Sequence, residues 1–470
     1  MLDFLNAVDS FLYYPILLVV LSFAGLYFSV RTQFVQIRLL FDSFRALKEK
    51  PQEKKGVSSC EALLVSTASR VGTGNIVGVS TAICLGGPGA VFWMWLLAVI
   101  GGASAFIEST LAQVYKCRDK KTNSCYGGPA YYIEKALHSH GLALVFVVFL
   151  ILTYAFGFNL LCSYNLQSTF ETYSFYDSST TPWVIGLLLA LLVGWCLFGG
   201  GKRIVKITSI LVPVMGFFYV LIALIVLITH IEAIPSVIVL IFKDAFDFAS
   251  IGGGIAGSCM IYGIKRGLYS NEAGVGSAPN AAASAQVAHP VQQGLVQMLS
   301  VYIDTLLICS ATALMCLVSG VDGNADNAGA RYVQDAVATT FGTIGPVFIT
   351  VAMALFAFTT LLGNLYYVRN GIAFLNKKKM PGRKSMSIIH IACASVVFLG
   401  AIAPMEMCWA LADITMGGMA LINLFACFVL GGVVFKVLKD YERKRQSKEY
   451  PVFIAKDIGL DDSNLDYWKE

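Results

Sequence analysis

The chain has 470 residues, of which 57% are hydrophobic and only 13% are charged, and its mean hydropathy is +0.69. Soluble domains are closer to half apolar and a quarter charged. The composition therefore excludes a soluble globular protein and predicts an all-α protein that crosses a lipid bilayer many times. The net charge of +5 is small and gives no reason to expect a nucleic-acid partner.

The twelve cysteines form no Cys-x-x-Cys pair, and most of them lie in apolar segments. We interpret them as small apolar residues and not as a disulfide framework or a metal site. Five histidines that do not cluster give no enzyme-like metal centre either. A channel would need a continuous polar stripe along its spans, and none of the apolar segments has one.

Eleven apolar segments predict about eleven transmembrane helices. Their approximate ranges, in chain order, are 11–30, 60–85, 90–114, 142–170, 183–198, 207–231, 246–267, 291–318, 346–367, 388–403 and 409–437. We divide the chain into an N-terminal helix with a basic amphipathic stretch (1–57), a transporter core (58–436) and a charged cytoplasmic tail (437–470). The tail is expected to be largely disordered.

The lysines and arginines of the loops set the orientation. With the N-terminus outside and the C-terminus in the cytoplasm, Lys243 and Arg331 are the basic loop residues that fall outside. This orientation places Lys265 and Arg266 in a cytoplasmic loop after the seventh span, where Lys265, Arg266 and Glu272 would form a gate or a loop network.

The second apolar segment contains three glycines, an asparagine and several hydroxyl residues near its middle, within 66–78. Gly72 and Gly74 lower helix propensity within a single turn. We predict a helix that breaks near the membrane midplane, where freed N–H and C=O groups must face a ligand, an ion or water. The alternative is a continuous helix whose glycines pack closely against a neighbour.

The seventh segment is interrupted in a similar way, by glycines at 252, 253, 254 and 257. If the first span is set aside, the two glycine-rich segments are the first and the sixth of ten. Five helices is an odd number, so the second five would enter the membrane from the opposite side. This spacing predicts an inverted repeat, with halves at about 58–231 and 246–436, and a discontinuous helix that opens each half.

Several motifs resemble the signature of the alanine or glycine:cation symporters, also called the sodium:alanine symporter family. The motifs run over 71–79, 85–95, 263–279 and 289–297, the last leading to Asp304-Thr305, and the likeness covers roughly 31–436. The resemblance implies a LeuT-type fold with one extra N-terminal helix. It also implies sodium-coupled import of a small neutral amino acid across the plasma (bacterial inner) membrane by a monomeric carrier, with no enzymatic activity and no organic cofactor.

A neutral amino acid is a zwitterion, so its site needs one positive end and one negative end. Half-helix N-termini supply N–H groups for the carboxylate, and freed carbonyl and amide oxygens accept from the ammonium. We expect Thr73, Gly74 and Asn75 to provide these groups from the first break. The second break would provide them through Gly252, Gly253, Gly254 and Gly257.

By resemblance to the fold, the sodium site is expected at Ser69 and Gly72 of the first broken helix and at Thr359 and Thr360 of the ninth span. Sodium prefers hard oxygen ligands. The alternative for both threonines is ordinary back-bonding of their hydroxyls to their own helix.

Two further polar positions are pocket candidates in the fourth span, Ser163 and Asn165, of which Asn165 matches a family asparagine. The alternative for Asn165 is a packing hydrogen bond between helices. The family usually has glutamine where Ser163 stands and tryptophan in place of Asn364. Both changes remove side-chain volume, so the predicted substrates are alanine or glycine first, with D-alanine, serine, asparagine and glutamine as further candidates.

Charged residues within the spans are functional candidates by default. Arg70 either holds an inner gate by pairing with an acid or extends to the membrane interface. Asp304 is the residue that would carry a proton in the alternative function, a proton-coupled carrier of neutral amino acids. Against that alternative, neither glycine-rich interruption contains a histidine or a carboxylate.

Overall fold

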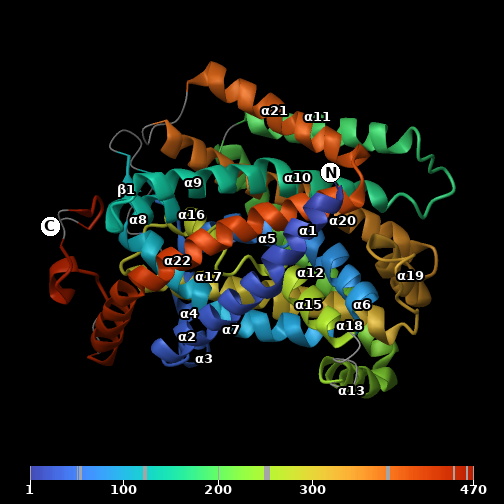
Figure 1. Ribbon diagram of the computed structural model, residues 1–470, viewed down its shortest axis with the longest axis horizontal. Coiled ribbons are helices and arrows are strands. Elements are labelled where there is room, and N and C mark those ends of the chain that lie inside the picture. Colours follow the sequence, from blue (N-terminus) through green and yellow to red (C-terminus); the bar gives the residue numbers. More distant parts are fainter. Residues whose placement is uncertain are drawn as a thin grey trace.

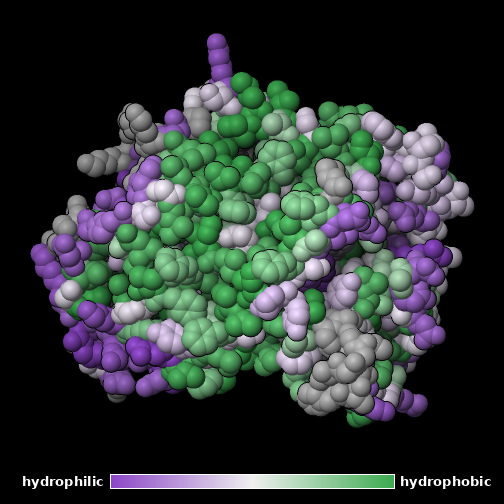
Figure 2. Space-filling view, viewed as in Figure 1, coloured by the Kyte–Doolittle hydropathy of each residue, from purple (hydrophilic) through white to green (hydrophobic). Residues whose placement is uncertain are grey.

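The computed structural model describes residues 2–49, 51, 56–119, 124–199, 201–247, 255–376, 382–447, 450–461 and 464–468. The described chain is a bundle of helices, most of which run along the longest axis of the molecule, with one short hairpin of strands β1 (Cys117–Arg118) and β2 (Cys125–Tyr126) (Figure 1). Hydrophobic side chains cover the middle of the visible face, and hydrophilic ones gather towards the two ends of the long axis (Figure 2). This distribution is what a bundle embedded in a bilayer requires.

Among the described residues, nine helices are long and apolar enough to cross a membrane. Three of them contain a π-helical turn: α1–α2 (Leu2–Phe11 and Leu18–Arg31), α9–α10 (His140–Ile151 and Phe158–Ser168) and α17–α18 (Pro290–Tyr302 and Ser310–Val318). The other six are α7 (Ala90–Val114), α11 (Thr181–Phe198), α12 (Gly201–Thr229), α20 (Ile344–Leu375), α21 (Arg383–Ile402) and α22 (Met405–Gln446). All nine correspond to predicted spans, and the two predicted spans outside this set are the glycine-rich ones.

The first glycine-rich segment is interrupted as predicted. Helix α5 (Ser59–Arg70) begins with a capping box between Ser58 and Glu61, and it ends where Val71 takes an extended conformation. A π-helical turn (Gly74–Gly78) and helix α6 (Val79–Gly86) continue the segment beyond the break. The packing alternative of one continuous helix is therefore wrong.

The second predicted interruption falls mostly outside the described part of the chain: Gly252, Gly253 and Gly254 are not among the described residues, and Gly257 lies within helix α15 (Ile255–Asn271). The backbone also unwinds after Asn271, where Glu272, Gly274 and Gly276 all have positive φ angles of 52°, 82° and 93°. A short helix, α16 (Ala278–Ala282), follows. Glycine adopts such angles without steric cost, whereas Glu272 must be held in place by its surroundings.

The loops contain further short helices that the hydropathy reading did not predict. They are α3 (Val35–Arg38), α4 (Leu40–Lys48), α8 (Pro129–Ala136), α13 (Ile234–Ala245) and α19 (Ala330–Phe341), with 3₁₀ turns at Ile231–Ala233 and Ala455–Ile458. Helix α4 belongs to the stretch predicted to be basic and amphipathic.

The expectation of a largely disordered tail is wrong for its described residues. Helix α22 continues to Gln446, and beyond it Phe453, Ala455 and Leu465 are buried. The Phe453 N–H donates to Ala288 O at 2.9 Å, and the Trp468 indole donates to Gln113 O at 2.8 Å. The tail thus packs over the ends of α7 and α17 at the end of the long axis where the chain finishes (Figure 1).

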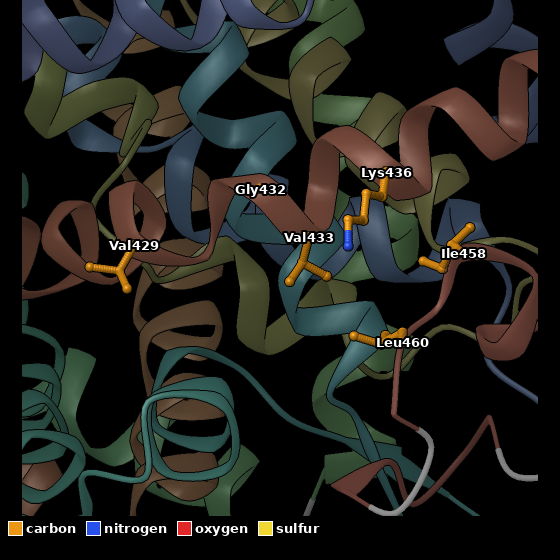
Figure 3. Close-up of a pocket in the computed structure, with 6 residues that line it drawn as sticks. All are labelled: Val429, Gly432, Val433, Lys436, Ile458 and Leu460. Carbon is orange, nitrogen blue, oxygen red and sulfur yellow. The ribbon is translucent and has the colours of Figure 1, made fainter.

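Where the tail returns alongside α22, it leaves a cavity of ≈ 300 Å³. Figure 3 shows this cavity between the helix and the tail, lined by Val429, Gly432, Val433, Lys436, Ile458 and Leu460. It lies far along the chain from the interrupted helices and shares none of the predicted site residues.

Candidate functional site

Asn75 organises the first break. Its side-chain Oδ1 accepts a hydrogen bond from the Gly72 N–H at 2.7 Å, and so replaces a helical partner that the break has removed. Its backbone carbonyl accepts from the Thr312 hydroxyl of α18 at 2.7 Å. The residue is fully buried. The predicted position of Asn75 in the break is confirmed, and its amide holds the break in shape.

The other side of the Asn75 amide connects the first broken segment to α15 and to the turn after α17. Its Nδ2 donates to Asp304 Oδ1 at 2.7 Å and to Ser270 Oγ at 3.0 Å. The hydroxyls of Ser270 and Thr305 donate to Asp304 Oδ2 at 2.7 and 2.9 Å. Asp304 is therefore a buried carboxylate with several donors, next to the break and not at a membrane surface.

Thr73 and Asn165 also meet at the first break. The Asn165 Nδ2 donates to Thr73 Oγ1 at 3.1 Å. Asn165 Oδ1 and the Ser163 hydroxyl are buried and have no hydrogen-bond partner among the described residues. Leaving buried polar atoms unpaired costs free energy, so these two oxygens of α10 mark positions that lack a partner among the described residues.

Aromatic rings cover this region on the side of the chain's N-terminus. Gly74 has no side chain because the Tyr269 ring occupies the space: an added Cβ would lie 2.6 Å from that ring. Tyr269 contacts Phe158 and Trp409, with ring centroids 4.8 and 5.1 Å apart. The rings of α10, α15 and α22 thus enclose the polar break.

Ser69, Asn364 and Asn159 form a second polar connection, between α5, α20 and α10. The Ser69 hydroxyl lies 2.7 Å from Asn364 Oδ1, and Asn364 Nδ2 donates to Asn159 Oδ1 at 3.0 Å. Gly363 allows this close approach, since a Cβ at that position would lie 2.6 Å from the Ser69 backbone nitrogen. Asn364 is therefore bonded to the first broken helix in the structure.

Glu272 connects α5 to the unwound stretch after α15. Its Oε1 lies 3.3 Å from the Ser69 hydroxyl, and its Oε2 accepts from the Ser277 hydroxyl at 2.5 Å. The same unwound stretch is held from the other side by Glu108, which accepts from the Gly274 N–H at 3.3 Å and from Asn423 at 2.6 Å. Two buried carboxylates thus support this unwound stretch.

The two threonines of the predicted sodium site differ. The Thr359 hydroxyl donates to Leu355 O and Phe356 O of its own helix, at 3.0 and 3.1 Å, which is the back-bonding alternative. The Thr360 hydroxyl is buried without a partner among the described residues. A Cβ on Gly72 would lie 2.0 Å from Thr360 Oγ1, so this hydroxyl touches the backbone of the break.

Arg70 is buried, with 2% of its surface exposed. Its guanidinium contacts the Ser300 hydroxyl and lies 3.4 Å from Gln297 O, while Nε and Nη2 have no partner among the described residues. The alternative that Arg70 extends to the membrane interface is therefore wrong. No acid lies within ion-pair distance of it in the described part of the chain, so a gate through direct pairing is not formed here.

Lys265 and Arg266 do not lie in a cytoplasmic loop, which corrects the sequence-based prediction. Both belong to α15, where Lys265 pairs with Asp9 at 2.5 Å and Arg266 pairs with Asp413 at 3.0 Å. The Arg266 guanidinium also lies 3.6 Å from the centroid of the Trp409 ring. Asp9 lies in the last turn of α1 and Asp413 in the N-terminal part of α22, so the two pairs connect α15 to both of these helices.

Sequence reasoning missed Ser270, Tyr269, Asn159 and the place of Glu272. The signal for three of them, Tyr269, Ser270 and Glu272, was present in the polar stretch 265–286, which the hydropathy reading assigned to a loop. Asn159 gave no signal beyond being an amide inside an apolar span.

Comparison with known proteins agrees with this geometry. The profile of the sodium:alanine symporter family matches residues 1–455. The chain is 44% identical to the amino-acid carrier protein AlsT of Bacillus subtilis, over 95% of this chain and 93% of that one. It is 40% identical to the probable sodium/glutamine symporter GlnT of the same organism, over 98% and 94%.

Among solved structures, MhsT in complex with L-phenylalanine superposes with a TM-score of 0.59 over 81% of this chain and 90% of that one, at 14% identity. That likeness concerns the fold alone, and it confirms the predicted LeuT-type architecture.

Proposed function

Because the chain belongs to the sodium:alanine symporter family, we propose that it imports a small neutral amino acid together with sodium by alternating access. Cation-coupled symport of amino acids is the activity of this family, and the chain is a transporter and not an enzyme. We place it in the plasma (bacterial inner) membrane as a monomer, with the N-terminus outside and the C-terminus inside.

The observation that carries this proposal is the enclosed polar region at the first break. Asn165, which is bonded to Thr73 there, has a buried Oδ1 without a partner among the described residues, and this oxygen suits an ammonium group; the Ser163 hydroxyl, two residues earlier on α10, is likewise buried without a partner. The N–H groups that follow Gly72 suit a carboxylate. A site of this kind binds a zwitterion without placing a charged side chain in the pocket, which keeps the desolvation cost low.

For the substrate, we propose alanine or glycine first, with D-alanine, serine, asparagine and glutamine as further candidates. Ser163 and Asn364 are smaller than the glutamine and tryptophan expected from the family pattern, which favours a larger pocket. The name of the relative GlnT supports glutamine as a member of this group.

For the cation, we propose sodium held by oxygens near Ser69, Gly72 and Thr360. The free hydroxyl of Thr360 favours it as a ligand over Thr359, whose hydroxyl is already bonded. The proton-coupled alternative would use Asp304, which is buried beside Asn75 and Ser270.

Uptake of a panel of labelled amino acids into proteoliposomes tests the proposal. An inward sodium gradient should drive uptake, while a proton gradient alone should not. Thr360→Ala should raise the sodium concentration for half-maximal uptake, and Thr359→Ala serves as the matched control that leaves it near the unmodified value. Uptake that proceeds equally without sodium, or that follows the proton gradient, would replace sodium coupling with the Asp304 alternative.

Substrate range is tested in the same vesicles. Unlabelled glutamine should compete with labelled alanine in the unmodified protein, and Asn364→Trp should weaken that competition. If a large excess of glutamine never competes, the enlarged pocket is wrong and the carrier is restricted to small residues.

A further inference from the structure

Two acceptor oxygens lie close to the hydroxyl oxygen of Ser69, which makes a group of three oxygens. Asn364 Oδ1 lies 2.7 Å from Ser69 Oγ, and Glu272 Oε1 lies 3.3 Å from it. All three residues are buried. A hydroxyl has one hydrogen, so it can donate fully to only one of the two acceptors. The other acceptor then faces a lone pair of the serine, which is unfavourable unless a cation lies between them or the Glu272 carboxyl carries a proton that it donates to the serine.

The orientation of Asn364 does not relieve this excess of acceptors. Its Nδ2 donates to Asn159 Oδ1, and Asn159 Nδ2 in turn donates to Ala155 O of its own helix at 3.4 Å. Rotating either amide would bring two donors or two acceptors together. The chain of amides therefore fixes Asn364 Oδ1 towards Ser69.

A fourth oxygen lies close by. Thr360 is one helical turn before Asn364 on α20 and so shares its face, and its buried hydroxyl has no partner among the described residues. It touches the backbone at Gly72, three residues after Ser69. The unpartnered hydroxyl is thus directed at the same junction between α5 and α20.

The charge of Glu272 points the same way. Its carboxylate is buried and accepts from the Ser277 hydroxyl, and no basic side chain forms an ion pair with it among the described residues. A buried charge without a counter-charge is costly, and a monovalent cation bound at Ser69 would balance it.

We propose that Glu272 is a charge-bearing ligand of the transported cation, together with Ser69, Asn364 and Thr360. This rests on the proposed cation coupling and goes beyond it. It places a carboxylate from the unwound stretch after α15 in the cation site, and it gives Asn364, a candidate pocket residue, a second role as a cation ligand. The cation would connect α5 to that unwound stretch, which links its occupancy to the relative position of the two segments.

The test is thermal unfolding of the purified full-length protein, without solute, in sodium chloride against choline chloride at constant ionic strength. The unmodified protein should unfold at a higher temperature in sodium. Glu272→Gln keeps the shape and removes the charge, and it should raise the half-saturating sodium concentration by about tenfold or more. Glu108→Gln removes a carboxylate that does not touch Ser69, and it should keep the sodium response.

Glu272→Asp retains the charge and serves if Glu272→Gln does not fold. It should keep a sodium response at a raised concentration, because the shorter side chain draws the carboxylate back. A sodium response unchanged in either Glu272 variant overturns the assignment of Glu272 while leaving sodium coupling intact. If sodium does not raise the unfolding temperature of the unmodified protein, and lithium and potassium do not raise it either, the cation site itself and the proposed coupling are both overturned.

Discussion

The interrupted helices are closed off in different ways at the two ends of the molecule. At the end where the chain begins, two ion pairs lie inside the helical bundle: Lys265 with Asp9 and Arg266 with Asp413. At the end where the tail lies, hydrogen bonds to loop backbone, such as Phe453 N–H to Ala288 O, are joined by ion pairs whose acids are partly exposed, Lys135 with Asp466 and Lys444 with Asp457. The first closure thus depends on two largely buried ion pairs, and the tail contributes backbone hydrogen bonds and more exposed ion pairs to the second.

This difference indicates at which end of the molecule the contacts can be broken in small steps. Breaking a buried ion pair leaves an uncompensated charge. The contacts of α15 with α1 and α22 are therefore expected to separate in one cooperative step. A closure built from separate backbone contacts can be undone one contact at a time. Four experiments test the contrast, beginning with the residue that lies between the two ends.

Asn75→Ala should abolish uptake while leaving membrane expression intact. The amide caps Gly72 and bridges Ser270 and Asp304, so its loss removes the shape of the break and its link to α15. Uptake by proteoliposomes containing equal amounts of protein measures the effect. Near-normal transport by the variant would remove Asn75 from the site.

Arg266→Ala should lower the free energy of unfolding by about 3–5 kcal/mol, because it leaves the buried carboxylate of Asp413 unpaired. The matched control is Arg331→Ala, whose partner Asp335 lies 3.9 Å away at an exposed position, and it should cost about 0–1 kcal/mol. Thermal unfolding of both variants makes the comparison. The double variant Arg266→Met with Asp413→Leu should recover much of the loss, and failure to do so would mean that the pair does more than balance charge.

A chain that ends after Ser447 should keep its fold and open the tail end. Cys117 is buried beside the tail residue Asp466, whereas Cys60 is exposed. In detergent, a maleimide should therefore label Cys60 in both proteins, and Cys117 only in the shortened one, with peptide mass spectrometry to separate the sites. Unchanged protection of Cys117 would show that the tail does not cover this end.

The smallest expected effect concerns Lys116, just beyond the end of α7. Its Nζ donates to Ala285 O at 2.9 Å and lies 3.7 Å from the centroid of the Tyr467 ring of the tail. Burial lowers the pKa of Lys116 from 10.5 to about 7. Between these two values the unfolded chain holds a proton that the folded protein has released, so stability should rise as the pH increases through this window.

Lys116→Gln should remove that part of the pH dependence. The unfolding temperature of both proteins, followed from about pH 6 to about pH 9, measures it as the difference between the two curves. Parallel curves would mean that Lys116 keeps its proton when buried, held by the aromatic rings of the tail.

The sequence was sufficient for the spans and for the first break, because Gly72, Gly74 and Asn75 are conspicuous inside one apolar segment. It did not predict the unwound stretch at Glu272–Gly276, which lies in a polar segment that hydropathy assigns to a loop. The glycines at 252–254 of the predicted second break lie outside the described residues. Hydropathy reports the solvent that a residue prefers, and it cannot show that other helices bury Glu272, Ser270 and Lys265 with their partners.

The same limit explains the tail and the ionic residues. Phe453 and Leu465 are isolated apolar residues in a charged segment, and only the folded chain shows the surface that receives them. The pairing of Asp9 with Lys265 joins positions 256 residues apart. No local pattern predicts such a contact.

Gly363 has a consequence for the tolerance of the chain to mutation. A single methyl group at this position would lie 2.6 Å from the Ser69 nitrogen, and the neighbouring atoms are also backbone, so no side chain can rotate away to make room. Alanine, usually the mildest substitution, would therefore be nearly as harmful here as leucine. In a library of all single variants, position 363 should accept no residue other than glycine. Tightly packed positions at which an added methyl group would meet only flexible side chains should accept several residues.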